Sequence, residues 1–422
     1  MANPFFPGKP VPPEHFVGRT SEINFALDLI YVRSHCAIWG GPGMGKTSFL
    51  RKLASEQALR EHGIDPSEVV IVLLSCENII PFTPAGFWRE VLTMLCDQLD
   101  SEPQLQAEIK PLLEQTVTND SLRQALGRLG NKGKFLLLLV DDLDAALVSN
   151  DQYTEAEMGT FLAQCRNLAV HAEEGRYLSM IVASLQPLSQ PDCGPKPNPN
   201  ASPWYNHYLF QSLKLFTTSE LVELLTIIRP PTLRGEIINI TGGHPTLVQT
   251  AGFLLWGQIQ PGNTPNIKTF ARGFERDTQQ IFQTIWDRCS EIDQALLMLI
   301  ALLDMEGHIE EIKFNLSGIG RILTQHRRWL STLEDRGVIT SSSTDTGTFY
   351  SFTSSLMKKW VTEEILKTSN TLIKDREKEF LNLISHGQVG KVKEVVTWLG
   401  NHPENVKSVL DWIAKVVPVF PK

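Results

Sequence analysis

Residues 40–47 match the phosphate-binding pattern G-x-x-x-x-G-K-[ST], which constrains the fold more than any other feature of the chain. They read Gly40, Gly41, Pro42, Gly43, Met44, Gly45, Lys46 and Thr47. An apolar run at 36–39 precedes them and a helical pattern at 48–54 follows, so the sequence predicts the strand–loop–helix unit that this motif requires. The alternative, a glycine-rich turn without function, is disfavoured by those flanks.

The loop's chemistry indicates a nucleoside triphosphate ligand. Backbone N–H groups at glycines surround phosphate oxygens, and the helix that begins there adds its positive dipole end. Lys46 is expected to reach the β- and γ-phosphates, and the Thr47 hydroxyl to ligate Mg²⁺. Ser48, the next residue, is also expected to bind the nucleotide.

A second acidic element follows the most apolar run of the chain, residues 135–140. Asp141 is expected to hold Mg²⁺, mostly through water, and Asp142 to orient or deprotonate the attacking water, with Asp144 as runner-up. The carboxyl ends of parallel strands are where such sheets bind ligands. The alternative is an acidic helix N-cap after a core strand. Ser184, at the end of the next predicted strand, is a candidate contact for the γ-phosphate or the water, although a strand-end serine is more often a turn residue.

Composition excludes several classes of protein. The formal net charge of −8 argues against a protein that coats nucleic acid. The six cysteines are scattered without a C-x-x-C pair, so neither a zinc site nor a redox pair is indicated. The N-terminus lacks the pattern of a signal peptide, and no apolar run approaches the ~20 residues of a membrane span. We therefore expect a soluble cytoplasmic protein with reduced thiols and no membrane partner.

The order of elements predicts an α/β fold with a parallel P-loop NTPase sheet, followed by a helical lid, a winged-helix domain and a short helical C-terminal segment. Continuous apolar runs separated by helical patterns (such as 85–99 and 122–129) indicate a parallel sheet covered on both faces. The strands are expected at 36–39, 69–75, 135–140, 177–183 and 208–215. The expected domains are 1–216 for nucleotide binding, 217–286 for the lid, 287–368 for the winged helix and 369–422 for the terminal segment.

The expected recognition helix of the winged-helix domain runs from Gly318 to Arg336. Its candidate DNA-facing residues are Arg321, His326, Arg327 and Arg328, whereas Trp329, Leu330 and Leu333 are predicted to be core. Residues 290–422 carry 16 Lys and Arg against 17 Asp and Glu, a net charge of −1. DNA-binding domains usually show a basic face, so DNA is possible but not favoured.

The segment Phe16-Val17-Gly18-Arg19-Thr20-Ser21-Glu22 resembles the h-h-G-R-x-x-E element that precedes the P-loop in AAA+-related ATPases. With Gly243-His244-Pro245 in the predicted lid and a winged helix after it, the chain resembles the STAND class of signalling ATPases over roughly residues 14–362. The resemblance implies that Val17 and Gly18 lie against adenine, that Arg19 and Glu22 brace that turn, and that Pro245 packs on the adenine or ribose. The alternatives are a turn with a surface charge, and a helix C-cap followed by a helix-starting proline.

Two departures from the family pattern bear on turnover and locking. Many members carry an arginine after the sensor strand, but here Ala183 and Ser184 precede Leu185 and Gln186. Some carry a Met-His-Asp-like element whose histidine touches the β-phosphate of ADP, and the matching place here reads Phe352-Thr353-Ser354. ADP locking is therefore expected to be weaker or made by another residue, and hydrolysis to be slow.

The resemblance implies an ATP/ADP-controlled signalling switch that slowly hydrolyses ATP with Mg²⁺, and that forms a homo-oligomer in the ATP state with a protein effector acting in trans. A DNA-associated AAA+ ATPase, initiator-like or transposition-related, is the alternative, and the lid-side arginines Arg272 and Arg276 leave it open. A nucleotide-binding scaffold without turnover is a third. The sequence does not identify the upstream signal, the effector, the oligomer size, ADP retention, DNA binding by the winged helix, or the role of residues 369–422.

Overall fold

The computed structural model forms two compact units, divided after residue 213. It describes residues 3–190, 193–196, 202–228, 231–259, 266–304, 308–309, 312–313, 323, 325–344 and 347–367. The sheet unit spans Gly8–Leu213, and the helical unit combines Met1–Pro7 with the chain from Lys214 onward. The predicted terminal segment 369–422 lies outside the described residues.

The sheet unit contains five parallel strands in the order β2-β3-β4-β1-β5. Their bounds are β1 His35–Trp39, β2 Val69–Ser75, β3 Phe135–Asp141, β4 Leu178–Ser184 and β5 Tyr208–Ser212. Strands β3 and β4 are buried along their whole length, as continuous apolar runs predict. The register sets Ser75 opposite Asp141 and Trp39 opposite Ser184, so the polar ends of neighbouring strands meet at one edge.

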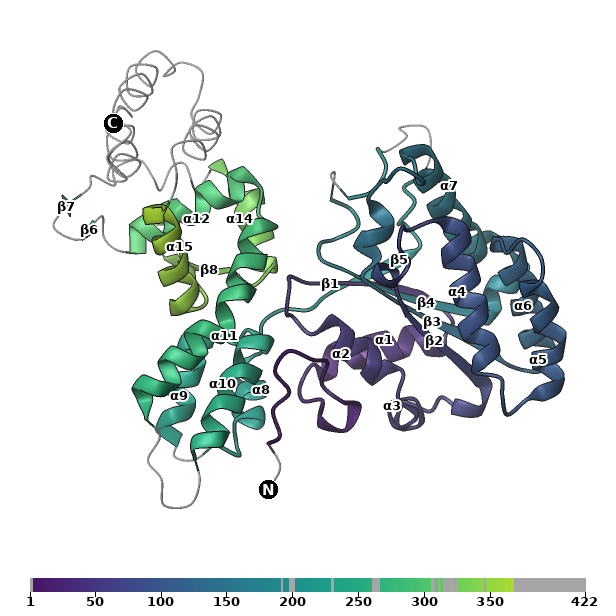
Figure 1. Cartoon of the computed structure of the whole chain (residues 1–422), viewed down its shortest axis with the longest axis horizontal. Helices are drawn as coiled ribbons and strands as arrows, with labels where there is room; N and C mark the ends of the chain where they lie inside the picture. The colour runs from purple at the N-terminus through teal and green to yellow at the C-terminus, as the bar shows by residue number, and fades with distance from the viewer. Residues whose placement is uncertain are drawn as a thin grey trace, which may run out of the picture. The chain divides into compact units, whose positions relative to one another are not determined.

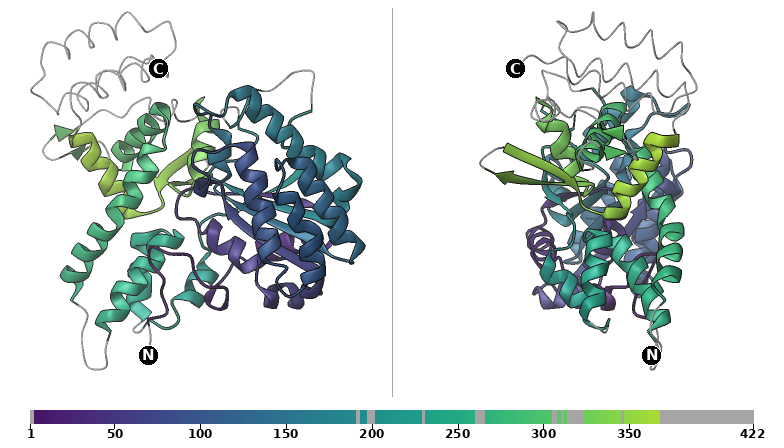
Figure 2. Two further views of the ribbon diagram at one scale, coloured as in Figure 1. Left: turned by 45° about the vertical axis from the view of Figure 1, so that its right-hand side comes forward. Right: turned by 90° about the vertical axis from the view of Figure 1, so that its left-hand side faces the viewer.

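Helices cover both faces of this sheet (Figures 1 and 2). Successive residues of a strand point to opposite faces, so Leu137 and Leu139 join one core and Leu136 and Leu138 the other. The first core is closed by α1 Thr20–Tyr31, α2 Lys46–Leu53 and α3 Glu56–Glu61, and the second by α4 Pro84–Asp97, α5 Pro103–Ile109, α6 Asn119–Asn131 and α7 Glu155–Arg166. A π-helix, η6 Asn167–His171, continues α7.

The sequence prediction of a parallel α/β sheet is confirmed. Each predicted strand overlaps an observed one, and the predicted helices at 85–99 and 122–129 correspond to α4 and α6. The sequence pattern does not predict the short connecting elements one by one. They include the 3-10 segments η1 Pro13–His15, η2 Pro66–Glu68, η3 Cys76–Asn78, η4 Lys110–Leu113, η5 Leu143–Leu147 and η7 Glu173–Tyr177. Segments of three to five residues hold too few positions for a periodic pattern to show.

The helical unit has a continuous apolar core of its own. Its elements are α8 Thr218–Leu224, α9 Pro231–Thr241, α10 Pro245–Gln258, α11 Ile267–Asp287, α12 Glu291–Asp304, β6 His308–Ile309, β7 Ile312–Lys313, α14 Arg327–Asp335, β8 Ile339–Thr344, β9 Gly347–Phe352 and α15 Ser355–Lys367. Phe5 is buried in this core, and the Phe6 N–H donates to Gln249 Oε1 at 2.8 Å. The N-terminal residues therefore pack with the helical unit, whereas the sequence-based division assigned them to the nucleotide-binding domain.

The turn between α9 and α10 is held against the start of α15. Gly242 has φ +57°, and a Cβ there would lie 1.9 Å from the Thr353 carbonyl oxygen, so only glycine fits. The Ser354 hydroxyl donates to the Ile240 carbonyl at 2.6 Å. The segment that carries Pro245 is therefore fixed to the segment 353–354 within one compact unit.

One core assignment from the sequence is wrong. Leu330 and Leu333 of α14 are buried as predicted, but Trp329 is 37% exposed. Helix α14 begins at Arg327, and the predicted start at Gly318 lies outside the described residues. Because Trp329 directly precedes Leu330, it points about 100° away from it around the helix, and the packed stripe follows Leu330 and Leu333 instead. No helix in the described part of the chain is long and apolar enough to cross a membrane.

Two histidines pack together at the amino-terminal end of the sheet. His35 begins β1, accepts the Met180 N–H at Nδ1 (3.1 Å), and its ring centroid lies 5.7 Å from that of His207. Burial, and then repulsion from His35, lowers the pKa of His207 to about 3. His207 is therefore neutral in the folded protein across the pH range in which an exposed histidine gains a proton.

This burial predicts a loss of stability in weak acid. The unfolded chain binds a proton at His207 below about pH 6.5, whereas the folded chain does not. His207 therefore leaves the free energy of unfolding unchanged above pH 6.5 and lowers it progressively from pH 6.5 toward pH 3. Between pH 7 and pH 5 we expect His207 alone to lower the free energy of unfolding by about 2 kcal/mol. Urea denaturation at both pH values measures it.

Two phenylalanine variants separate this effect from general acid sensitivity. His207→Phe removes the titrating group and should show a smaller loss between pH 7 and pH 5 than the wild type. His171→Phe changes an exposed histidine and should leave the wild-type loss intact. An equal loss in the wild type and His207→Phe would refute the assignment.

Candidate nucleotide site

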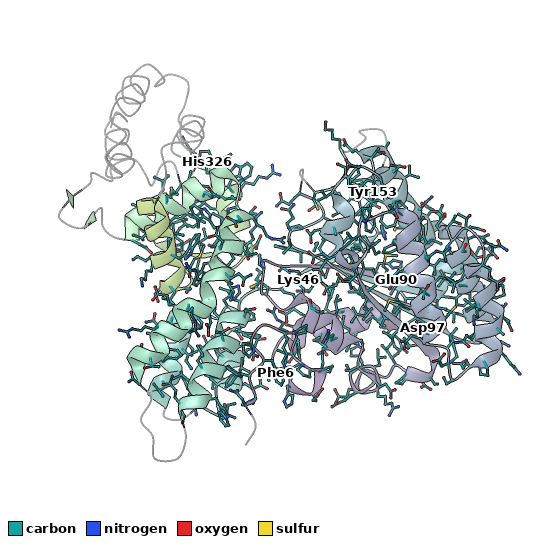
Figure 3. The ribbon with its side chains drawn as sticks, viewed as in Figure 1. Phe6, Lys46, Glu90, Asp97, Tyr153 and His326 are labelled. Carbon is teal, nitrogen blue, oxygen red and sulfur yellow. The ribbon has the colours of Figure 1, made fainter. Side chains whose placement is uncertain are left out.

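The P-loop connects the end of β1 to the start of α2 in the sheet unit. Gly45 caps α2 with φ +88°, a left-handed conformation that glycine adopts without strain. Lys46 begins the helix and is labelled in Figure 3. Its Nζ donates to the carbonyl oxygens of Gly40 (2.8 Å) and Gly41 (3.3 Å), and the side chain is 8% exposed. A bound phosphate would offer these ammonium protons a charged acceptor, which forms the stronger hydrogen bond.

Thr47 and Asp141 are brought into direct contact. The Thr47 hydroxyl donates to Asp141 Oδ2 at 2.6 Å, joining the first turn of α2 to the end of β3. Burial raises the pKa of Asp141, and the hydrogen bond from Thr47 opposes that shift. A buried carboxylate beside a hydroxyl presents the oxygen ligands that Mg²⁺ prefers, with water and phosphate oxygens completing its shell. The residues present therefore fit the predicted magnesium ion.

Asp142 is held by a residue that the sequence analysis missed. Its φ is +50°, and its Oδ2 accepts a hydrogen bond of 2.7 Å from the hydroxyl of Ser75, the last residue of β2. Because Ser75 is the register partner of Asp141, it lies one strand away from both acidic residues. The sequence signal for Ser75 is that it is a polar residue at the end of an apolar strand.

The Asp144 carboxylate forms hydrogen bonds within the fold. Both of its carboxylate oxygens accept the Leu185 N–H, at 2.9 and 3.2 Å, which ties η5 to the segment after β4. The Ser184 hydroxyl is fully buried and donates to the Gln186 carbonyl at 2.8 Å. Ser184 still lies between the P-loop and Asp141, since β4 separates β1 from β3. Its predicted contact with a phosphate stays a prediction.

The segment that carries Val17, Gly18 and Arg19 lies against the P-loop. Gly18 and Arg19 have φ values of +78° and +56°, so the chain turns sharply before α1. The Arg19 side chain is 4% exposed, and its Nη2 donates to the Met44 carbonyl at 2.9 Å. Arg19 therefore braces the phosphate-binding loop.

Two other predicted residues, Ser48 and Pro245, are placed as follows. The Ser48 hydroxyl accepts the Val11 N–H at 2.9 Å, which fastens the segment before α1 to α2. Pro245 begins α10 in the helical unit, after Gly242 and Gly243 close the preceding turn. Its predicted contact with the nucleotide stays a prediction.

Residues 15–171 match the family model described as the AAA ATPase domain. This segment is less than half of the chain and contains the P-loop, Asp141 and Asp142. It is similar to an AAA-type P-loop ATPase domain, as the resemblance to AAA+-related ATPases predicted. No curated protein matches the chain in sequence.

Comparison with solved structures covers more of the chain than this domain. A Walker-type ATPase of Pyrococcus abyssi is 14% identical with a TM-score of 0.50, over 84% of this chain and 99% of that one. The ORC2 protein of Aeropyrum pernix, in its ADPNP–ADP complexes, is 13% identical with a TM-score of 0.48, over 86% and 96%. Domain III of the Thermotoga maritima replication initiation protein DnaA is 14% identical with a TM-score of 0.39, over 63% and 95%. At these identities the likeness concerns the fold alone.

Proposed function

We propose that this protein binds ATP with Mg²⁺ in the sheet unit and hydrolyses it. The observation that carries this proposal is the hydrogen bond of 2.6 Å between Thr47 and Asp141, which joins the phosphate-binding loop to the acidic strand end. Lys46 binds the β- and γ-phosphates, and Thr47 and Asp141 hold Mg²⁺, which neutralises phosphate charge when bound.

Asp142 is the proposed base that orients the attacking water. In this structure Ser75 occupies one of its carboxylate oxygens. The other carboxylate oxygen of Asp142 remains able to accept a proton from the attacking water, so Ser75 acts as a positioning residue that orients the carboxylate.

For the helical unit we favour DNA as the partner over a protein effector. Arg327, Arg328 and Trp329 are all exposed on α14, immediately before the β8–β9 hairpin. Cations beside an exposed aromatic ring form the combination that binds phosphate and stacks on bases. The chain's net charge of −8 predicts modest affinity, and contacts from only two arginines predict a shallow dependence on salt.

The ADP-locked switch has less support. The residues at the place of the family's Met-His-Asp element are Thr353 and Ser354, whose hydroxyls donate to the Gly337 and Ile240 carbonyls of the same unit. Neither supplies a positive charge to an ADP phosphate. Oligomerisation in the ATP state is retained as part of the proposal.

The distinguishing experiment measures ATP turnover of the full chain with and without duplex DNA, and identifies any nucleotide released on denaturing fresh protein. We expect DNA to stimulate turnover and the double variant Arg327→Glu, Arg328→Glu to lose that stimulation while keeping basal turnover. A control pair of exposed cations in the sheet unit, Arg60→Glu with Lys110→Glu, should retain it. Stoichiometric ADP together with no DNA effect would favour the signalling switch instead.

A further inference from the structure

A cavity in the helical unit lies between α11 and α15, on elements that the ATPase proposal does not use. Its volume is about 290 Å³. This lies just below the range of roughly 300–1,000 Å³ typical of small-molecule sites, so it fits one or two side chains rather than a whole cofactor. The lining residues are Arg272, Glu275, Arg276, Gln279, Phe282, Leu356, Lys359 and Trp360.

The floor of this cavity is apolar and largely buried. Phe282 and Trp360 are 4% and 6% exposed, and Leu356 is half-buried beside them. The Trp360 ring packs edge-on against Trp286, with ring centroids 5.5 Å apart. A floor of this kind binds an apolar or aromatic side chain by removing both surfaces from water.

The rim is positively charged. Arg272, Arg276 and Lys359 are exposed around the floor, with one acid, Glu275, that pairs with Lys359 across the two helices at 2.5 Å. These lining residues carry three cations and one anion, and Asp277 beside Arg276 is a second anion, so the rim has a local charge of +1 on a chain whose net charge is −8. Within the described part of the chain Arg272 has no hydrogen bond or ion pair, and Arg276 forms an ion pair with its neighbour Asp277 at 2.7 Å.

The spacing of the arginines determines how far apart the acidic groups of a bound partner must lie. Arg272, Arg276 and Gln279 follow one another at intervals of four and three residues, so they form a stripe along one face of α11. Arg272 and Arg276 are separated by about 6 Å along the helix axis. Two acidic residues four apart on a partner helix present charges at the same separation.

We propose that the cavity between α11 and α15 binds an acidic amphipathic helix of a partner protein, whose large apolar side chain enters the floor while acidic residues one turn apart pair with Arg272 and Arg276. A nucleic acid is the weaker fit because Phe282 and Trp360 are almost fully buried, unlike Trp329, and so offer no open ring face on which a base can stack. Helices commonly bind in grooves through such apolar anchors.

A designed peptide tests this proposal on the full-length protein. The probe is a fluorescein-labelled helical peptide with leucine and phenylalanine on one face and glutamates four residues apart beside them. The matched probe carries glutamine in place of each glutamate. Fluorescence anisotropy should show salt-sensitive binding of the acidic probe, at least about tenfold tighter than binding of the glutamine probe.

Protein variants assign that binding to the cavity. The double variant Arg272→Glu, Arg276→Glu should bind the acidic probe at least about tenfold more weakly than the wild type does. The control Arg60→Glu, Lys110→Glu makes an equal change of charge and should keep the wild-type affinity. If the first pair impairs folding by circular dichroism, Gln279→Trp keeps every charge, obstructs the groove and should also weaken binding.

Three results would overturn the proposal. The first is equal binding of the two probes. The second is unchanged binding of the acidic probe to both cavity variants when these are folded. The third is displacement of the acidic probe by duplex DNA, where that displacement depends on Arg272 and Arg276. The last would assign the cavity to nucleic acid. Because these readouts require no nucleotide, they remain distinct from failure of the proposed ATPase activity.

Discussion

Replacing Lys46 with alanine is expected to remove nearly all ATP binding and turnover. The Lys46 ammonium is buried at the P-loop and donates to two loop carbonyls, so it is already directed into the loop that receives the phosphates. Removal of one preorganised charged donor from such a site costs about 100- to 1,000-fold in rate. Equilibrium binding of a fluorescent ATP analogue and a phosphate-release assay measure the two losses.

The control for this variant is Arg51→Ala, on the same helix but exposed. It should retain binding and turnover within about twofold, as most exposed substitutions do. If Lys46→Ala bound ATP as tightly as Arg51→Ala, the phosphate-binding role of this loop would be refuted.

Asp142→Asn is expected to separate binding from hydrolysis. The amide keeps the shape of the side chain and can still accept the hydrogen bond from Ser75, but it is a poor base. Loss of a general base typically lowers the rate by about 100- to 10,000-fold. We therefore expect turnover to fall at least about 100-fold while the affinity for ATP stays within a few-fold of the wild type.

Asp144→Asn is the matched control because it makes the same chemical change two residues away. The Asp144 carboxylate accepts the Leu185 N–H, and an amide oxygen can accept that hydrogen bond too. Its turnover should therefore stay near the wild-type value. A larger loss in Asp144→Asn than in Asp142→Asn would reverse the two assignments and make the runner-up the catalytic residue.

The sequence predicted those parts of the site that are encoded locally. The P-loop is a contiguous pattern with a strand before it and a helix after it, and Asp141 directly ends a buried strand. The sequence also predicts that Thr47 and Asp141 hold one Mg²⁺, because both motifs lie at the same edge of a parallel sheet, whereas their direct hydrogen bond is a finding of the structure. These features depend on residues that are close together or on a general rule of sheet topology.

The partners that depend on strand order could not be predicted in the same way. The contact of Ser75 with Asp142 requires β2 to lie beside β3, and that of Asp144 with Leu185 requires β4 to lie beside β3. Arg19 was assigned to its own turn, whereas its guanidinium reaches the Met44 carbonyl 25 residues later. The pattern of residues along a single chain does not show which strands are neighbours in the sheet.

In the helical unit, side-chain periodicity predicted the helices better than their packing. Leu330 and Leu333 are buried as expected, but the adjacent Trp329 is exposed because it lies off the packed stripe. Hydrophobicity alone assigned Trp329 to the core. Its exposure beside Arg327 and Arg328 is what directs the proposal toward DNA.

The most direct test of the central claim is calorimetric titration of the nucleotide-free wild-type protein with ATP and Mg²⁺. The account predicts one nucleotide per chain, bound through the Lys46 loop, and no measurable heat of binding in Lys46→Ala. Wild-type protein that is folded by circular dichroism yet binds no ATP would contradict it.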